Sequence, residues 1–150
     1  MKKMIKDFQG NYRWLSNFAP VTISIENRNY PSVEHAYMSF KSDESTWKDF
    51  CANENNSAGK VKMTSRKIKL IEDWNDSFRL KLMEDLIRVK FNQEPYKSNL
   101  LATGNQNIQE GNYWNDKFFG ICLKTGMGEN HLGRLIMKIR DELNKETCHE

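Results

Sequence analysis

Apolar residues recur at helical spacing along two long stretches of this chain, and that periodicity limits its fold more than any other feature. The first stretch follows Trp74, with Asn75 or Asp76 as the expected N-cap, and the second begins near Asn130. The two stripes consist of Phe78, Leu82, Met83, Leu86, Ile87 and Phe91, and of Leu132, Leu135, Ile136, Ile139 and Leu143. Each stripe predicts an amphipathic helix that buries one face. Helices must therefore supply most of the core.

Strand patterns are short by comparison. Residues 21–25 alternate between apolar and polar side chains, residues 118–123 are almost continuously apolar, and residues 12–18 form an aromatic run, so each predicts a strand. Further short helices are expected around 47–51 and 56–62, and after Pro95, with Gly104 as the stop signal. The expected fold class is α+β, a helix-rich domain with a small β-sheet.

Length and composition narrow the possible partners. A chain of 150 residues with 38% hydrophobic side chains is expected to form one domain over residues 1–150. A net charge of +3 suits a phosphate-bearing ligand but falls short of the basic stripe of a dedicated duplex-DNA binder. The N-terminus has no apolar signal segment, and no window has the eighteen or so apolar residues of a membrane span. A cytoplasmic location without membrane partners is expected.

The three cysteines argue against a metal centre or a disulfide framework. Cys51, Cys122 and Cys148 are widely spaced, and no CxxC pair or combined His/Cys ligand spacing occurs. Neither a metal nor a cofactor is expected.

The segment 30–41 carries the clearest candidate chemistry. Pro31 marks a turn, and Ser32 is a good N-cap for a short helix with Glu34 in its first turn. Lys41 follows seven residues later, which predicts an acid and an amine on one helix face, about 10 Å apart along the axis. A polar cluster at 110–116 reads as a loop. Together the two segments predict a site assembled from distant parts of the chain.

Structural explanations compete with these functional ones. An acid in a first turn such as Glu34 is favoured by the helix dipole, and Lys41 is equally explained as a solvated cation near a helix end. Trp114 offers a stacking face for a base and Asp116 a group that orients water or ribose hydroxyls. A half-buried indole and an Asx turn explain the same two residues equally well.

Other motifs point less directly to a ligand. Residues 126–128 resemble a phosphate-cradling turn, and Asn130 is expected to cap the next helix, whose N-terminus favours an anion. A lone Gly-x-Gly without a preceding βαβ unit excludes a dinucleotide-binding Rossmann site. Three tryptophans on apolar stripes are expected in the core: Trp14, Trp47 and Trp74.

An ordered set of short motifs, spread from about residue 8 to residue 143, resembles the NADAR family, also called YbiA-like. The motifs are Leu15-Ser16-Asn17-Phe18, Tyr30-Pro31-Ser32-Val33-Glu34-His35, Lys41, Ala58-Gly59, Lys62, Trp74, Lys90-Phe91, Leu100-Leu101-Ala102-Thr103-Gly104, Glu110-Gly111-Asn112, Trp114-Asn115-Asp116, Gly120, Asn130-His131-Leu132-Gly133 and Met137-Lys138-Ile139-Arg140. The family includes N-glycosidases that act on early riboflavin-pathway intermediates and enzymes that remove ADP-ribose from guanine bases in nucleic acid. The resemblance implies a metal-free N-glycosidase with the helix-rich fold already expected.

The resemblance also implies roles for single residues. Glu34 would stabilise an oxocarbenium-like transition state, Lys41 would act as a Schiff-base nucleophile or as a phosphate or ribose anchor, and Asp116 would complete the catalytic set. The implied substrate-binding residues are Asn17, Phe18, His35, Tyr37, Trp114, Gly120 and Asn130. His35 points about 100° away from Glu34 around the helix, which favours a packed, hydrogen-bonded ring.

The substrate is the least determined part of the prediction. The basic run Lys60, Lys62, Arg66, Lys67 and Lys69, and the lack of a fused partner domain, slightly favour ADP-ribosylated guanine in nucleic acid. The alternatives are a small phosphorylated ribosylamino-pyrimidine of riboflavin synthesis and a module that binds ADP-ribose without cleaving it. Departures from the family pattern near the expected pocket, at Met38-Ser39, Thr64-Ser65-Arg66 and Phe119, bear on substrate rather than fold. The oligomeric state stays open.

Overall fold

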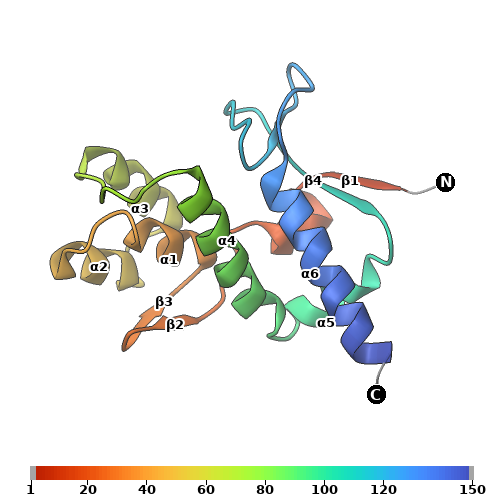
Figure 1. Ribbon diagram of the computed structural model, residues 1–150, viewed down its shortest axis with the longest axis horizontal. Coiled ribbons are helices and arrows are strands. Elements are labelled where there is room, and N and C mark those ends of the chain that lie inside the picture. The colour runs from red at the N-terminus through yellow and green to blue at the C-terminus, as the bar shows by residue number, and fades with distance from the viewer. Residues whose placement is uncertain (1–2, 149–150) are drawn as a thin grey trace. The chain divides into compact units, whose positions relative to one another are not determined.

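The computed structural model describes residues 3–148, which fold into a helix-rich α+β structure with two small sheets (Figure 1). The predicted fold class is thereby confirmed. The chain divides into two compact units, one of residues 17–90 and one, the terminal unit, of residues 1–16 and 91–150. The predicted extent of a single domain over 1–150 stays a prediction.

The 17–90 unit is built around a short buried helix. Its elements are β2 (Ile23–Ile25), β3 (Arg28–Tyr30), α1 (Val33–Ser39), α2 (Ser45–Ala52), α3 (Ala58–Thr64), the 3-10 turn η2 (Ser65–Lys67) and most of α4 (Asp76–Phe91). β2 and β3 pair antiparallel, joined by Glu26 and Asn27, both with positive φ. α1 packs against α2, α3 and β3, and all seven of its residues are buried.

The terminal unit joins a strand near the N-terminus to two strands from the last third of the chain in one sheet. Its elements are β1 (Met4–Asp7), the 3-10 helix η1 (Gly10–Leu15), α5 (Tyr96–Ala102), β4 (Asn107–Asn112), β5 (Ile121–Cys122) and α6 (His131–Cys148). The strand order is β1-β4-β5, with both neighbouring pairs parallel, and α6 packs against β4. A Cβ at Gly111 would meet the carbonyl oxygen of Lys6, so the register of β1 on β4 requires glycine there.

The helices agree closely with their sequence signals. The Asn75 side chain accepts a hydrogen bond from the Phe78 N–H at 3.0 Å, so Asn75 is the N-cap of α4. Gly104 follows α5 with φ 64°, the left-handed conformation expected of a helix stop. Within residues 3–148, no helix is long and apolar enough to cross a membrane.

Four local predictions were wrong. Residues 12–18 are not a strand: η1 ends at Leu15 and a turn follows. Residues 110–112 are the end of β4 rather than loop, because the parallel pairing with β1 decides their conformation. Only Ile121–Cys122 of the strand expected at 118–123 is formed. α1 ends at Ser39, so Lys41 lies in the turn beyond the helix instead of on its face.

Candidate active site

Glu34 is fixed at the start of α1 by two local contacts. The Ser32 side chain caps the helix by accepting from the His35 N–H at 3.2 Å, and the Glu34 N–H donates to the Asn17 carbonyl at 3.0 Å. Glu34 is only 6% exposed. A buried carboxylate is costly unless a protein uses or compensates its charge, so a solvated first-turn acid does not describe this residue. The burial favours the functional interpretation of Glu34.

Lys41 is held in place by both its backbone and its amine. Its carbonyl accepts from the Ile71 N–H at 2.9 Å. Its Nζ donates to Ser65 Oγ at 3.1 Å and lies 5.8 Å from the centre of the Trp74 ring. The amine is therefore directed into the structure rather than into solvent.

Burial is the largest influence on the Lys41 amine, and it lowers its pKa below the ordinary lysine value. The Glu34 carboxylate opposes this effect, whereas the cations of Arg79, Lys62 and Arg66 reinforce it, and the net pKa is lowered. Glu34 and Lys41 are thus close enough to interact electrostatically. A lysine in this environment has more of the neutral, nucleophilic amine at neutral pH than a surface lysine has.

A second group of contacts surrounds the same pair. Arg79 Nε donates to Tyr37 Oη at 3.0 Å, and the Tyr37 ring packs 5.2 Å from the ring of Trp74. Lys62 Nζ lies 5.9 Å from the centre of the Phe18 ring. The structure therefore gathers Phe18 and Tyr37, both predicted to bind substrate, among the cations that surround Lys41.

The Asn17 side chain has an unused acceptor. Its Nδ2 donates to the sulfur of Met83 at 3.5 Å, while its Oδ1 is buried and has no hydrogen-bond partner among the residues that the structure describes. An unsatisfied buried acceptor is unfavourable in a folded protein, and a donor on a ligand would satisfy it. This observation supports the predicted ligand contact of Asn17.

His35 uses both ring nitrogens within the 17–90 unit. Nε2 donates to the Asn56 carbonyl at 2.7 Å, and Nδ1 lies 2.6 Å from Ser32 Oγ. Because a carbonyl only accepts, the neutral ring carries its proton on Nε2 and Nδ1 accepts from the serine. The ring ties the start of α1 to the segment before α3, as expected of a packed histidine.

In the terminal unit, Asp116 organises the loop after β4. Its Oδ1 accepts from the N–H groups of Phe118 and Phe119, both at 3.0 Å. The buried Asn112 side chain clamps the same residue, with Nδ2 donating to the Asp116 carbonyl at 2.9 Å and Oδ1 accepting from its N–H at 3.0 Å. The Asx-turn interpretation of Asp116 therefore has direct support, and a catalytic role for it stays a prediction.

The remaining predicted residues of the terminal unit differ in exposure. Trp114 is 57% exposed on the loop that Asp116 organises. A Cβ at Gly120 would meet the backbone carbonyl oxygen of Glu110, so only glycine fits there. The Asn130 side chain does not cap α6: its Oδ1 accepts from the Glu110 N–H at 2.9 Å and its Nδ2 donates to the Ile108 carbonyl at 3.0 Å. Asn130 thus ties the start of α6 to β4.

Three residues around Lys41 were missed by sequence reasoning. Trp74 was expected in the core, but it precedes α4, lies off the helical stripe and is half-buried beside the Lys41 amine. Ser65 and Arg79 had no signal in the sequence beyond a departure from the family pattern at 64–66. Ser65 contacts Lys41 in the turn after α1, and Arg79 contacts Tyr37 of α1. Residue spacing alone does not predict either contact. Asn17, Phe18, Glu34, His35, Tyr37 and Lys41 share the 17–90 unit, and Trp114, Asp116, Gly120 and Asn130 lie in the terminal unit.

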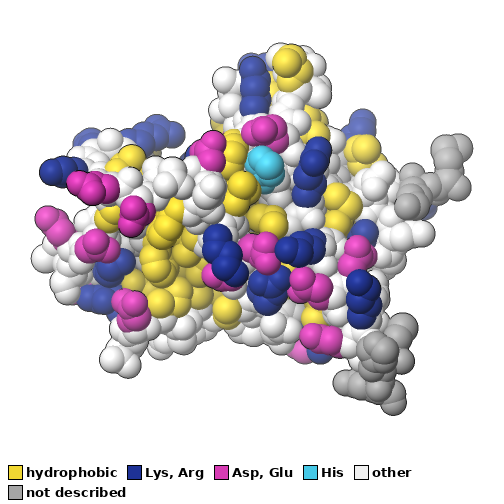
Figure 2. Space-filling model, viewed as in Figure 1, with side chains coloured by type: hydrophobic (Ala, Val, Ile, Leu, Met, Phe, Trp, Pro, Cys, Tyr) yellow, Lys and Arg dark blue, Asp and Glu magenta, His cyan; other side chains and the backbone are white. Residues whose placement is uncertain are grey.

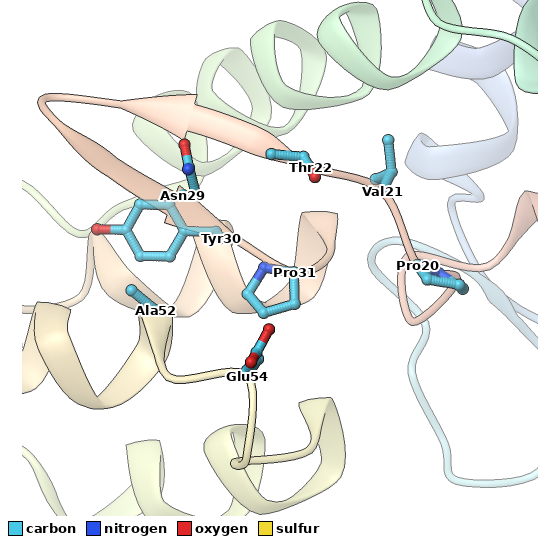
Figure 3. Close-up of a pocket in the computed structure, with 8 residues that line it drawn as sticks. All are labelled: Pro20, Val21, Thr22, Asn29, Tyr30, Pro31, Ala52 and Glu54. Atoms are coloured by element: carbon cyan, nitrogen blue, oxygen red, sulfur yellow. The ribbon is translucent and has the colours of Figure 1, made fainter.

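A separate open hollow of about 530 Å³ lies beside the β2–β3 hairpin (Figure 3). It is lined by Pro20, Val21, Thr22, Asn29, Tyr30, Pro31, Ala52 and Glu54. None of the candidate catalytic residues lines this hollow. Its one acid, Glu54, is exposed, and its lining adds no further titratable group except the Tyr30 phenol. The chemistry of the site therefore belongs to the Lys41 surroundings.

Comparison with known proteins gives consistent results. The NADAR domain model matches residues 5–144. The chain is 33% identical over 140 residues to a riboflavin biosynthesis protein of Vibrio vulnificus, covering 91% of this chain but only 37% of that protein. It is 30% identical over 141 residues to an N-glycosidase of Nostoc punctiforme, covering 88% and 86%, and 27% identical over 135 residues to the N-glycosidase YbiA of Escherichia coli, covering 89% and 82%. The solved structure of Escherichia coli YbiA matches with a TM-score of 0.85 at 27% identity, covering all of this chain and 90% of that one.

Proposed function

Because this chain belongs to the NADAR domain family, we propose that it is an N-glycosidase that hydrolyses the bond between ribose C1 and a nitrogen of a nucleobase or related heterocycle. One observation carries the proposal: the buried carboxylate of Glu34 lies close enough to the partly buried amine of Lys41 to influence its pKa. The names of the Nostoc and Escherichia coli relatives support the same reaction class. A chain that only bound ADP-ribose would not need this pair.

Glu34 supplies the electrostatic part of the reaction. Breaking an N-glycosidic bond develops positive charge on C1 and on the ring oxygen of the ribose. A carboxylate held in place by α1 and shielded from water stabilises that charge more than an exposed acid would. Its fixed geometry also means that little reorganisation is needed when the bond breaks.

Lys41 supplies the nucleophile. Neutral Nζ attacks C1, the bond from C1 to the base nitrogen breaks, and the ribose ring opens to leave an imine between Nζ and C1. The two protons that Nζ loses go to the ring oxygen and to the departing base nitrogen. Water then adds to C1, which releases the ribose portion as an aldehyde and restores the amine.

The favoured substrate is guanine carrying ADP-ribose in nucleic acid. The cations near Lys41 suit phosphate groups, and the exposed side chains of Lys60, Arg66, Lys67 and Lys69 extend the positive surface over α3, η2 and the segment just after η2. Figure 2 shows basic side chains gathered at the α3 end of the 17–90 unit. The predicted stacking of a base on Trp114, whose ring is exposed, stays a prediction.

A small phosphorylated ribosylamino-pyrimidine is the second candidate substrate. It is favoured because the Vibrio relative and a Zea mays relative, 31% identical over 145 residues, are both named riboflavin biosynthesis proteins. Such a substrate carries a single phosphate, which the cations around Lys41 are sufficient to hold. Binding such a substrate would leave the extended basic surface of α3 without a phosphate group to contact.

A product assay separates these candidates. The protein is incubated with guanine-ADP-ribosylated DNA and, separately, with the phosphorylated ribosylamine, and released ADP-ribose or ribose 5-phosphate is measured by mass spectrometry. Release from the DNA that is lost in Glu34→Gln supports the favoured substrate, and release from the small molecule alone supports the second. Tight ADP-ribose binding with no product from either would overturn the glycosidase proposal.

A further inference from the structure

The hydrogen bonds of Ser65 give the Lys41 amine a fixed direction. Ser65 Oγ donates to the Lys62 carbonyl at 2.7 Å and receives the Lys41 Nζ hydrogen bond at 3.1 Å. A serine hydroxyl has one proton, and Ser65 donates it in the hydrogen bond to the Lys62 carbonyl. Toward Nζ, the Ser65 Oγ can therefore act only as an acceptor. The lone pair of a neutral Lys41 amine is therefore not occupied by Ser65. It stays available for attack while one N–H is anchored.

Arg79 is a cation held close to the same amine by neutral and acidic partners. Nε donates to Tyr37 Oη at 3.0 Å, and Nη1 lies 3.1 Å from the largely exposed carboxylate of Asp76. Tyr37 packs on Trp74, the ring beside Lys41 Nζ. The Arg79 side chain is 27% exposed, so its charge is only partly screened by water.

The charged groups that face Lys41 act in opposite directions. Glu34 from α1 favours the ammonium form, and the face of the Trp74 ring does the same. Arg79 from α4, Lys62 from α3 and Arg66 from η2 disfavour it, with Arg79 the strongest of the three. Together with burial, these cations outweigh the carboxylate. Among the three cations, Arg79 is thus the one whose removal changes the balance most.

We propose that Ser65 and Arg79 are positioning residues that prepare Lys41 for attack on ribose C1, Ser65 by directing its lone pair and Arg79 through the positive charge that its hydrogen bond to Tyr37 fixes near Trp74, the ring beside Nζ. This inference rests on the proposed glycosidase function, but it assigns roles to two residues outside the acid and amine themselves. The two roles are separable. Ser65 governs geometry without favouring the neutral amine, because an acceptor stabilises the ammonium at least as well. Arg79 governs charge.

The test measures Lys41 directly and does not depend on a substrate. Lys41 is labelled with acetic anhydride over a range of pH, and its reaction rate is read from the mass of its peptide. The variants are Arg79→Gln, Ser65→Ala and Ser65→Thr. Lys81→Gln is the matched control, because it removes one positive charge from the same helix at an exposed lysine paired with Asp85. The release of product is measured on the same proteins.

The expected results differ for each variant. In Arg79→Gln, labelling of Lys41 at pH 8 slows several-fold and the rise of turnover with pH moves to higher pH, while Lys81→Gln matches wild type. In Ser65→Ala, labelling is as fast as in wild type or faster, yet turnover falls, and Ser65→Thr restores it. Unchanged labelling in Arg79→Gln, or full turnover in Ser65→Ala, would overturn the inference. If Arg79→Gln is labelled more slowly than wild type but the wild-type protein releases no product, the charge assignment is supported and the glycosidase function is refuted.

Discussion

Replacing His35 by alanine is expected to destabilise the 17–90 unit severely, because the ring joins two buried segments. The change removes the donor to the Asn56 carbonyl and the acceptor of the Ser32 hydroxyl, and both partner residues are buried. Leaving a buried carbonyl unpaired costs about 1–3 kcal/mol. Loss of the ring from the closely packed start of α1 adds roughly 1–2 kcal/mol for the cavity. The sum, about 2–5 kcal/mol, is a large part of the roughly 5–15 kcal/mol that stabilises a typical domain.

Equilibrium urea unfolding, followed by tryptophan fluorescence and circular dichroism, measures this loss. His131→Ala is the matched control, because the His131 side chain is partly exposed, with Nε2 3.5 Å from the Glu129 carboxylate and its ring 4.7 Å from that of Phe118. That variant is expected to lose less than about 1 kcal/mol. Ser32→Ala should fall between the two, at about 1 kcal/mol, because it removes the N-cap of α1. If His35→Ala unfolds within 1 kcal/mol of wild type but loses substrate affinity, His35 binds the ligand and the structural interpretation is refuted.

Three further predictions concern the site. Glu34→Gln keeps the shape of the side chain but not its charge, so turnover should fall by at least about 10²-fold while the melting temperature stays nearly unchanged. A large drop in the melting temperature would favour a structural role for Glu34. Since burial and neighbouring cations lower the pKa of Lys41, kcat/KM should rise with pH with a midpoint below the ordinary lysine value, whereas activity that declines over this range would show that Lys41 acts as a charged anchor. Asp116→Asn keeps Oδ1 as the acceptor of the Phe118 and Phe119 N–H groups, so its urea midpoint should match that of wild type. Turnover of this variant should fall only if the Asp116 carboxylate orients water. Asp116→Ala should lose stability as well.

The sequence was sufficient for elements whose signals are local. Ser32 caps α1, Asn75 caps α4 and Gly104 ends the segment after α5, because capping depends on one side chain or one left-handed residue. The apolar stripes predicted α4 and α6 for the same reason. The catalytic role of Glu34, which the family resemblance implies, stays a prediction.

Elements that depend on distant partners were not predictable in this way. β1 and residues 110–112 of β4 are strands only because the two segments, far apart in sequence, pair in parallel. The end of α1 at Ser39 moved Lys41 into a turn, where the Ile71 N–H and the Ser65 hydroxyl fix it. Arg79 and Trp74 both contact Tyr37 in the candidate site. Residue spacing in the sequence does not predict these contacts.

Trapping Lys41 during turnover tests the central claim most directly. The protein is incubated with guanine-ADP-ribosylated DNA in the presence of sodium cyanoborohydride, which reduces an imine to a stable amine, and the peptides are analysed by mass spectrometry. The predicted result is ADP-ribose attached through C1 to Lys41, absent in Lys41→Arg and much reduced in Glu34→Gln. Two results together would contradict the account. Wild-type protein would release ADP-ribose in full without any adduct, and Lys41→Arg would be as active as wild type.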